Sequence, residues 1–169
     1  MGVYVEKLRA GKAEREWFQS LLNVIIECFP KAASVPWVVN PRLSRSLGHC
    51  KAVARRVPGD PSSPDKGSWT CTEISINEDF LCRCYRKEVL GQVAFTPSFR
   101  EGRLIDTMVH EAAHLSHFNH GAFFQMANED IGRRVKAKLA GGGPVARTAA
   151  LVAGSKKPAS PRQAEFDFG

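Results

Sequence analysis

Four of the five histidines in the chain lie within the fifteen residues 107–121, TMVHEAAHLSHFNHG, together with one glutamate. His110, Glu111 and His114 form the pattern HExxH in this segment. In a helix, side chains four residues apart lie one above the other on one face, so both imidazoles can bind the same metal ion. Glu111 points slightly to the side, where its carboxylate can take a proton from a water molecule at the metal. The pattern therefore predicts a metal centre with a general base.

The two helical histidines need a further ligand, because a catalytic zinc site normally has three protein ligands and keeps one position for water. His117 lies seven residues after His110, which is about 10 Å along a straight helix and too far to share an ion. His120 can fold back onto the ion if the helix ends first. We therefore predict His110, His114 and His120 as the ligands, with His117 as a neighbour of the site.

The residues around His120 suggest how the chain turns back. We expect the helix over residues 103–118 to end at Phe118 and Asn119, because asparagine tolerates the left-handed conformation that closes many helices. Gly121 adds conformational freedom. Two carboxylates of the next predicted helix, Glu129 and Asp130, remain alternatives for the third ligand.

The elements that must position these residues follow from the hydrophobic pattern. The predicted HExxH helix has an apolar stripe at i, i+3, i+4, i+7 and i+8, formed by Ile105, Met108, Val109, Ala112 and Ala113. A second helix is predicted from about Ala13 to Phe29, where Pro30 stops the pattern. DFLCRCYRKEVLGQVAFTPSF is ambiguous and is read as a short helix followed by a loop that ends near Pro97. Residues 58–67 have the composition of a loop.

Three segments favour short strands: SVPWVVN, GHCKAVARRV and SWTCTEISIN. In the third, alternation puts Cys71, Glu73 and Ser75 on one face and Thr72, Ile74 and Ile76 on the other. We predict an α+β fold in which a small mixed or antiparallel sheet of about three strands packs against helices. Trp17, Trp37 and Trp69 are read as core residues, with base stacking as the alternative.

The composition of the chain limits its expected binding partners and its expected location in the cell. The net charge of +7 favours polyanions, and basic residues cluster in NPRLSRSLGHCKAVARRV and DIGRRVKAKLA, which suits either DNA or RNA contact or a solvated basic face. We find no apolar run of the roughly 20 residues that span a bilayer and no signal-peptide core. We therefore expect a cytoplasmic monomer, in the host cytoplasm if the source is viral, without a membrane partner.

Five cysteines, Cys28, Cys50, Cys71, Cys82 and Cys84, have no regular spacing. An odd number in a cytoplasmic chain predicts reduced thiols that behave as small buried hydrophobes. A second zinc site at the CxC pair is disfavoured, because structural zinc sites prefer CxxC knuckles.

The segment TMVHEAAHLSHFNHGAFF resembles the SprT-like metallopeptidases of the zincin superfamily, in which a third-ligand histidine and a glycine precede an aromatic residue, here His120, Gly121 and Phe124. RLSRSLGHC and TEISIN resemble the family's upstream strands, so the resemblance covers roughly residues 18–139. The spacing between the second and third histidines is also that of WLM-domain and YgjP-like metallohydrolases, and no cysteine follows Cys84 to form the zinc ribbon of many SprT proteins.

This resemblance implies a zinc-dependent endopeptidase of intracellular proteins, including proteins bound or crosslinked to DNA. Zinc would activate a water molecule, and Glu111 would move its proton to the leaving amine. His117 and Tyr85 are candidates for stabilising the oxyanion. Two alternatives stay open: a non-proteolytic adaptor that associates with DNA or a clamp and has a metal site, and a YgjP-like hydrolase of small molecules.

The chain divides into a predicted metallopeptidase domain, residues 1–140, and a flexible tail, residues 141–169, which is rich in Gly, Ala, Ser, Pro and Lys. The tail ends in PRQAEFDFG. Gln163, Phe166 and Phe168 resemble the peptide by which bacterial replication and repair proteins dock on the sliding clamp. A tail without a partner is the alternative.

Overall fold

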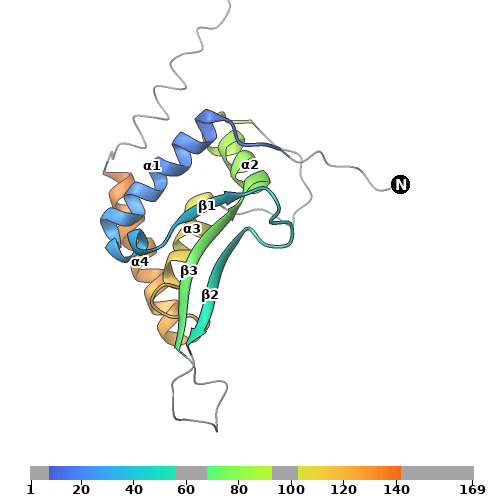
Figure 1. Ribbon diagram of the computed structural model, residues 1–169. Coiled ribbons are helices and arrows are strands. Elements are labelled where there is room, and N and C mark those ends of the chain that lie inside the picture. Colours follow the sequence, from blue (N-terminus) through green and yellow to red (C-terminus); the bar gives the residue numbers. More distant parts are fainter. Residues whose placement is uncertain (1–7, 56–67, 93–102, 142–169) are drawn as a thin grey trace, which may run out of the picture.

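The computed structural model describes residues 8–55, 68–92 and 103–141, and these fold into four α-helices and one three-stranded sheet (Figure 1). In chain order the elements are α1 (Lys12–Cys28), the short 3-10 helix η1 (Pro30–Ser34), β1 (Trp37–Asn40), β2 (Gly48–Arg55), β3 (Ser68–Asn77), α2 (Glu78–Glu88), α3 (Leu104–Ala113) and α4 (Ala122–Ala140). The predicted α+β class is confirmed. The predicted loop at 58–67 and the predicted clamp-binding residues Gln163, Phe166 and Phe168 lie outside the described residues.

The sheet is mixed, with β3 in its centre. β1 pairs with β3 in parallel and β2 pairs with β3 antiparallel. The register of β2 against β3 shifts between Lys51 and Ala52, and this bulge makes Thr72 an extra residue on β3. The predicted alternation is wrong there, because Cys71 packs with Ile74 in one buried cluster whereas Thr72 is exposed.

Helix α3 is central to the core, because it contacts β2 and β3 as well as α1, α2 and α4. All five residues of its predicted apolar stripe are buried. Helix α1 buries a comparable face, consisting of Trp17, Phe18, Leu21, Leu22, Val24 and Ile25. Each large apolar side chain buried in this way contributes about 1.5–3 kcal/mol of transfer free energy. This burial holds α3 firmly in its place in the core. None of the described helices has the length and apolarity needed to cross a membrane.

The cysteines differ from the expectation in one respect. Cys50 on β2 and Cys71 on β3 form a disulfide, with Cα atoms 6.1 Å apart, so reduced thiols were the wrong expectation for this pair. The bulge is the physical reason, because it turns Cys71 to the side of Cys50. These two residues and Ile74 form a small buried cluster, which we call the sheet cluster. Cys82 and Cys84 are buried and take no part in this disulfide, and burial raises their pKa to about 11 and about 12 respectively.

Candidate metal centre

Helix α3 carries the first part of the predicted centre and ends earlier than the sequence suggested. It runs Leu104–Ala113 with His114 as its C-terminal cap, so the predicted continuation to Phe118 is wrong. The next two backbone amides donate to carbonyls three residues back, at 3.0 Å each, and this tightens the last turn. Leu115 packs against the sheet cluster, and the contact draws the chain away from the helix axis.

The return segment, residues 114–121, reverses the chain without a left-handed residue. Among the described residues only Gly91 has a positive φ, so the predicted left-handed Asn119 is wrong. Gly121 has a φ of −83° and caps the N-terminus of α4. The early end of α3 lengthens the connection, so turns and bends in ordinary backbone regions are enough to bring the chain back.

His110, His114 and His120 converge as predicted. One ring nitrogen from each lies within 4.8 Å of the others, and His110 Nε2 and His120 Nε2 are 3.1 Å apart. Zinc–nitrogen distances of about 2.0–2.1 Å and tetrahedral angles put ligand nitrogens roughly 3.3 Å apart. The three histidines could therefore hold a metal ion.

His114 is oriented by its own return segment. Its Nδ1 lies 2.9 Å from the Phe118 carbonyl oxygen. Because a carbonyl only accepts hydrogen bonds, Nδ1 must carry the proton, and the lone pair of Nε2 is left for a metal. Metal-binding histidines commonly donate their second nitrogen to a carbonyl or carboxylate in this way.

Phe124, in the first turn of α4, forms the apolar floor of the centre. Its buried ring contacts the rings of all three histidines, at centroid distances of 5.0 Å, 4.6 Å and 4.6 Å. Burial, with neighbouring histidines as the second cause, lowers the pKa of His110 and of His114. Neutral imidazole is the form that binds metal ions, so the apolar surroundings favour the ligand state.

Glu111 lies beside the histidines, and its side chain is buried against the first residue of β2. Burial raises its pKa to about 7. A Cβ atom placed on Gly48 would lie 2.6 Å from both Cγ and Oε1 of Glu111. Only glycine at position 48 therefore leaves the carboxylate the space it occupies.

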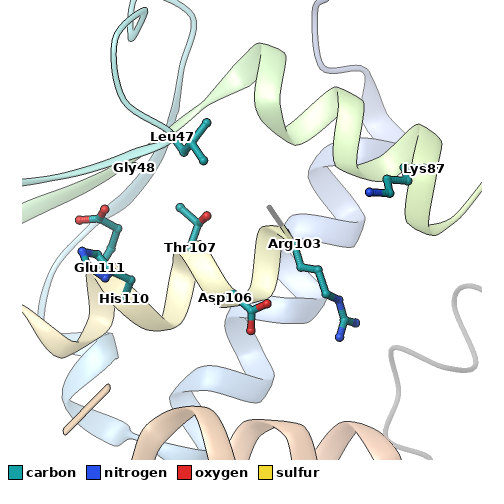
Figure 2. Close-up of a pocket in the computed structure, with 8 residues that line it drawn as sticks. All are labelled: Leu47, Gly48, Lys87, Arg103, Asp106, Thr107, His110 and Glu111. Carbon is teal, nitrogen blue, oxygen red and sulfur yellow. The ribbon is translucent and has the colours of Figure 1, made fainter. Parts of the chain in front are cut away.

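A cleft of about 700 Å³ opens beside Glu111 and His110 (Figure 2). It is lined by Leu47, Gly48, Lys87, Arg103, Asp106, Thr107, His110 and Glu111. Figure 2 shows Glu111 and His110 at one end and Lys87 and Arg103 at the other, with Thr107 and Asp106 between them on α3. A substrate in the cleft would thus extend from the histidines toward two cationic side chains.

The wall that carries Gly48 is held by Asn77, the last residue of β3. The Asn77 amide nitrogen Nδ2 donates to the carbonyls of Leu43 and Ser46 at 2.7 Å and 3.2 Å, and its backbone N–H donates to the Leu47 carbonyl at 2.9 Å. Its side-chain oxygen accepts from the backbone N–H of Phe80 and caps α2. One buried side chain therefore fixes both the start of α2 and the loop that leads to Gly48.

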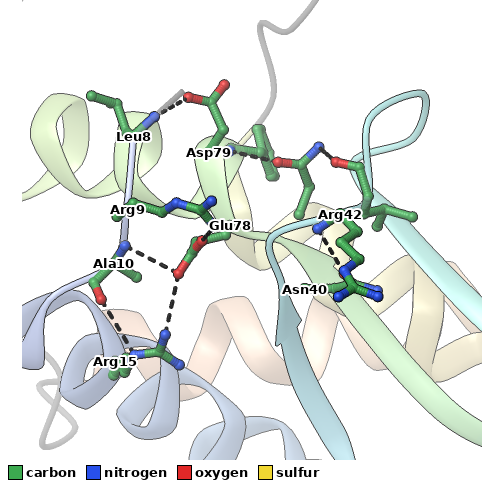
Figure 3. Close-up of polar contacts among 11 residues, drawn as sticks. Leu8, Arg9, Ala10, Arg15, Asn40, Arg42, Glu78 and Asp79 are labelled. Atoms are coloured by element: carbon green, nitrogen blue, oxygen red, sulfur yellow. Dashed lines mark hydrogen bonds and ion pairs between the residues drawn. The ribbon is translucent and has the colours of Figure 1, made fainter. Parts of the chain in front are cut away.

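The first turn of α2 is joined to the N-terminal segment by a polar network (Figure 3). The buried Glu78 accepts from Arg9, from the Ala10 amide and from Arg15, and Asp79 accepts from the Leu8 amide. Buried carboxylates need such partners to remain charged. The network thus stabilises the first turn of α2, which directly follows Asn77 in the chain.

The two candidates for oxyanion stabilisation lie in different surroundings. Tyr85 is buried in the core, edge-on to Trp17 at a centroid distance of 5.7 Å, so it does not face the cleft and that suggestion is wrong. His117 is exposed and stacks on Phe123 at 5.9 Å. It stays outside the three-histidine group, as predicted.

The carboxylate alternatives for the third ligand are not supported. Asp130 accepts from Arg133 and Arg134 at 2.7 Å and 2.6 Å, and Arg134 also donates to the Cys28 carbonyl at the end of α1. Glu129 is exposed on α4. Within the described ranges, neither carboxylate belongs to a group that could share a metal ion.

The tryptophans divide into three environments. Trp17 is in the core, and Trp37 is half-buried with its indole N–H donating to the Ala32 carbonyl. Trp69 is 46% exposed, which differs from the core position expected for it. Its ring stacks on Phe118, with centroids 5.0 Å apart and planes 14° apart.

Sequence reasoning missed the roles of Gly48 and Asn77. Their only sequence signals are a glycine immediately before a predicted strand and an asparagine at the end of another.

Comparisons of the chain with protein-family models, with curated proteins and with solved structures find no match.

Proposed function

We propose that the chain is a zinc-dependent metallopeptidase of the HExxH type that cleaves intracellular proteins. The observation that carries the proposal is the convergence of His110, His114 and His120 next to the buried Glu111. Structural zinc sites usually have four protein ligands, whereas catalytic sites have three and keep a position open. Only these three histidines group together in the described part of the chain, and a cleft opens beside them. This combination favours catalysis over a structural role.

Zinc suits three imidazole ligands, and when bound it would polarise the scissile carbonyl and lower the pKa of the attacking water. The surrounding groups of the chain orient the ligands and exclude water. His114 is held in the required tautomer by the Phe118 carbonyl. Phe124 excludes water from beneath the three rings, because its own side chain is buried there.

Glu111 is the proposed general base. With a pKa of about 7, its carboxylate and its carboxylic acid are both accessible near neutral pH. The carboxylate can thus accept a proton from the attacking water and deliver it to the leaving amine. The contact with Gly48 keeps this carboxylate at the end of the cleft.

The test combines metal analysis with cleavage of an unfolded protein such as casein. We expect about one zinc per chain and loss of cleavage after chelation. Glu111→Gln should keep its zinc and lose about 10²- to 10⁴-fold in activity, the usual contribution of a general base. A folded protein without zinc and without activity restored by added metal would refute the proposal. Equal behaviour of wild type and Glu111→Gln would favour the adaptor, and cleavage of nucleotides but of no protein would favour a small-molecule hydrolase.

The proposal extends to protein substrates bound or crosslinked to DNA, and the two basic clusters differ in how they support it. Four basic residues of α4 each contact a carboxylate: Arg133, Arg134, Lys136 and Lys138. Arg42 and Arg45, on the segment that leads into β2, and Lys51, inside β2, are exposed as well, but none of the three forms an ion pair with a carboxylate among the residues that the structure describes. Because a cation without a neighbouring carboxylate is more available to a phosphate, the proposed DNA contact lies on this segment and the start of β2.

Duplex binding measured at increasing salt tests this extension. The double variant Arg42→Glu/Arg45→Glu should weaken binding and reduce the salt dependence, since each lost phosphate contact lowers the slope by about one. Arg133→Glu/Arg134→Glu removes the same amount of positive charge and is the matched control, with a smaller expected effect. Equal losses in both variants would mean that net charge alone attracts DNA.

A further inference from the structure

Trp69 has an unusual position for a tryptophan, at the start of β3 with its side chain 46% exposed. One face of its ring is covered by the ring of Phe118, nearly parallel at a centroid distance of 5.0 Å. Phe118 belongs to the return segment, and its backbone carbonyl accepts the Nδ1 proton of His114 at 2.9 Å. The Phe118 ring also contacts the His114 ring, at a centroid distance of 5.9 Å. The sheet is therefore connected to a candidate metal ligand through the Trp69–Phe118 stack, and then through this ring contact and the hydrogen bond.

We propose that Trp69 is a positioning residue for the metal centre: by stacking on Phe118 it holds the Phe118 carbonyl against His114 Nδ1. The inference rests on the proposed metal-binding role of His114 and extends it to a residue on β3. Trp69 is not itself a ligand, and its action passes through the backbone of the return segment.

The return segment needs such a contact because its own hydrogen bonds are few. After the two amides that tighten the end of α3, its backbone hydrogen bonds run from His117 N–H to the Ala113 carbonyl at 3.0 Å and from Gly121 N–H to the Asn119 carbonyl at 2.8 Å. Phe118 lies between them, and its contacts are the stack on Trp69, the ring contact with His114 and the hydrogen bond that its carbonyl accepts. The sheet contacts the segment at two points, through Leu115 on the sheet cluster and through Phe118 on Trp69. Only the second lies at the residue whose carbonyl faces His114.

The consequence for metal binding is a choice of tautomer. With the Phe118 carbonyl in place, His114 carries its proton on Nδ1 and presents Nε2 as a ligand. If the carbonyl moves away, the imidazole can exchange tautomers and rotate, and part of the population no longer offers Nε2. Loss of a hydrogen-bond partner behind a ligating histidine typically weakens metal affinity about 10- to 100-fold.

The experiment compares Trp69→Ala, Trp69→Phe and Phe123→Ala in the full-length chain. Phe123→Ala is the matched control, because Phe123 is an exposed aromatic that also stacks on a residue of the return segment, the non-ligand His117. Zinc affinity is measured by competition with a chromophoric chelator. The His114 tautomer is read in the metal-free protein from long-range proton–nitrogen correlations of the imidazole.

Trp69→Ala should lose about 10- to 100-fold in zinc affinity and lose the Nδ1-protonated signature of His114. Trp69→Phe restores a stacking ring and should keep both properties, and Phe123→Ala should also keep both. Phe118→Leu keeps the backbone carbonyl and removes the stack from the other side, but it also removes the ring contact with His114. It should therefore lose at least as much zinc affinity as Trp69→Ala, and it serves if that variant does not fold. A Trp69→Ala protein with wild-type affinity and wild-type tautomer overturns the inference. If wild type itself binds no zinc, the proposed function fails, and the tautomer comparison still decides whether Trp69 orients His114.

Discussion

The two halves of the candidate metal centre are built in different ways. His110 and Glu111 lie inside α3, and the opposite face of that helix is part of the core. His120 is exposed and lies in the return segment, outside any helix or strand. The helical half is placed by hydrogen-bonded backbone and buried apolar area, whereas the return half is placed by a few side-chain contacts with the sheet and with α4.

Because of this difference, one half of the centre is in place before a metal binds, whereas the other half completes the site. His110 lies inside the buried helix α3 and His114 is its C-terminal cap, so the separation of these two candidate ligands is set before any metal binds. The third ligand completes the site only when the return segment is in place, so its contribution depends on contacts such as Trp69–Phe118 and on the Phe124 ring. Removing parts from each half should therefore have unequal effects.

The largest effect is expected from the ligands themselves. His110→Ala and His120→Ala should each weaken zinc binding by more than the about 10- to 100-fold that loss of a supporting residue causes. His110→Ala should be the more severe, because it removes the one candidate ligand that lies inside α3 and leaves His114 and His120, which both belong to the return segment. His117→Ala is the matched control and should bind zinc like wild type, since His117 stacks on Phe123 away from the cluster. Competition with a chelator measures the zinc affinity of all three variants. Unchanged affinity in His120→Ala would show that the third ligand lies elsewhere.

The same difference explains how much of the molecule could be predicted from sequence. Helical periodicity was sufficient for the α3 stripe and for the His110–Glu111–His114 pattern, because both depend on local geometry. The approach of His120 to His110 and His114 was predicted correctly, but the route to it was wrong: α3 ends at Ala113 and Asn119 is not left-handed. Leu115 draws the chain onto a cluster formed by two strands, and such a tertiary contact has no period in the sequence. The bulge at Thr72 and the Gly48–Glu111 contact were missed for the same reason.

The next largest effect concerns the floor of the site, where two neighbouring phenylalanines have opposite environments. Phe124→Ala should cost about 3–5 kcal/mol in the free energy of unfolding, as for other buried Phe→Ala substitutions, because the side chain is 1% exposed and contacts all three histidine rings. Phe123→Ala should have little effect, because that side chain is 72% exposed. Urea unfolding of the metal-free proteins measures both, and Phe124→Leu keeps enough apolar volume to test zinc affinity in a folded protein. Equal losses in the two alanine variants would contradict a role for Phe124 as the floor.

Zinc removal should affect the return half more than the helical half. A ligand at about 100 times its dissociation constant stabilises the folded state by about 2.7 kcal/mol, and this stabilisation should disappear on chelation. Hydrogen exchange should then accelerate in residues 114–121, whereas amides inside α3 should keep their protection, because they are bonded within a buried helix. His120→Ala should show neither response to chelation. Uniform acceleration across α3 and the return segment would mean that the two halves are one cooperative unit.

The smallest expected effect tests whether the sheet also tunes the helical half. In Gly48→Ala the new Cβ would lie 2.6 Å from Glu111 Cγ and Oε1, so the carboxylate must shift while His110 on α3 and His114 at its C-terminal cap keep their places. Zinc affinity should stay at the wild-type value, and cleavage should fall by up to about 10²-fold, the scale expected when a catalytic group moves by about 1 Å.

Gly132→Ala is the matched control for this change. The nearest atom to its new Cβ is Val109 Cγ1 at 3.7 Å, an ordinary contact, and an alanine inside α4 should stabilise the helix by about 0.5–1 kcal/mol. If Gly48→Ala loses zinc as well as activity, the β2 contact supports the whole centre and the helical half is less independent than its burial indicates. If neither property changes, Glu111 can relax freely, and its buried position is not what sets the catalytic geometry.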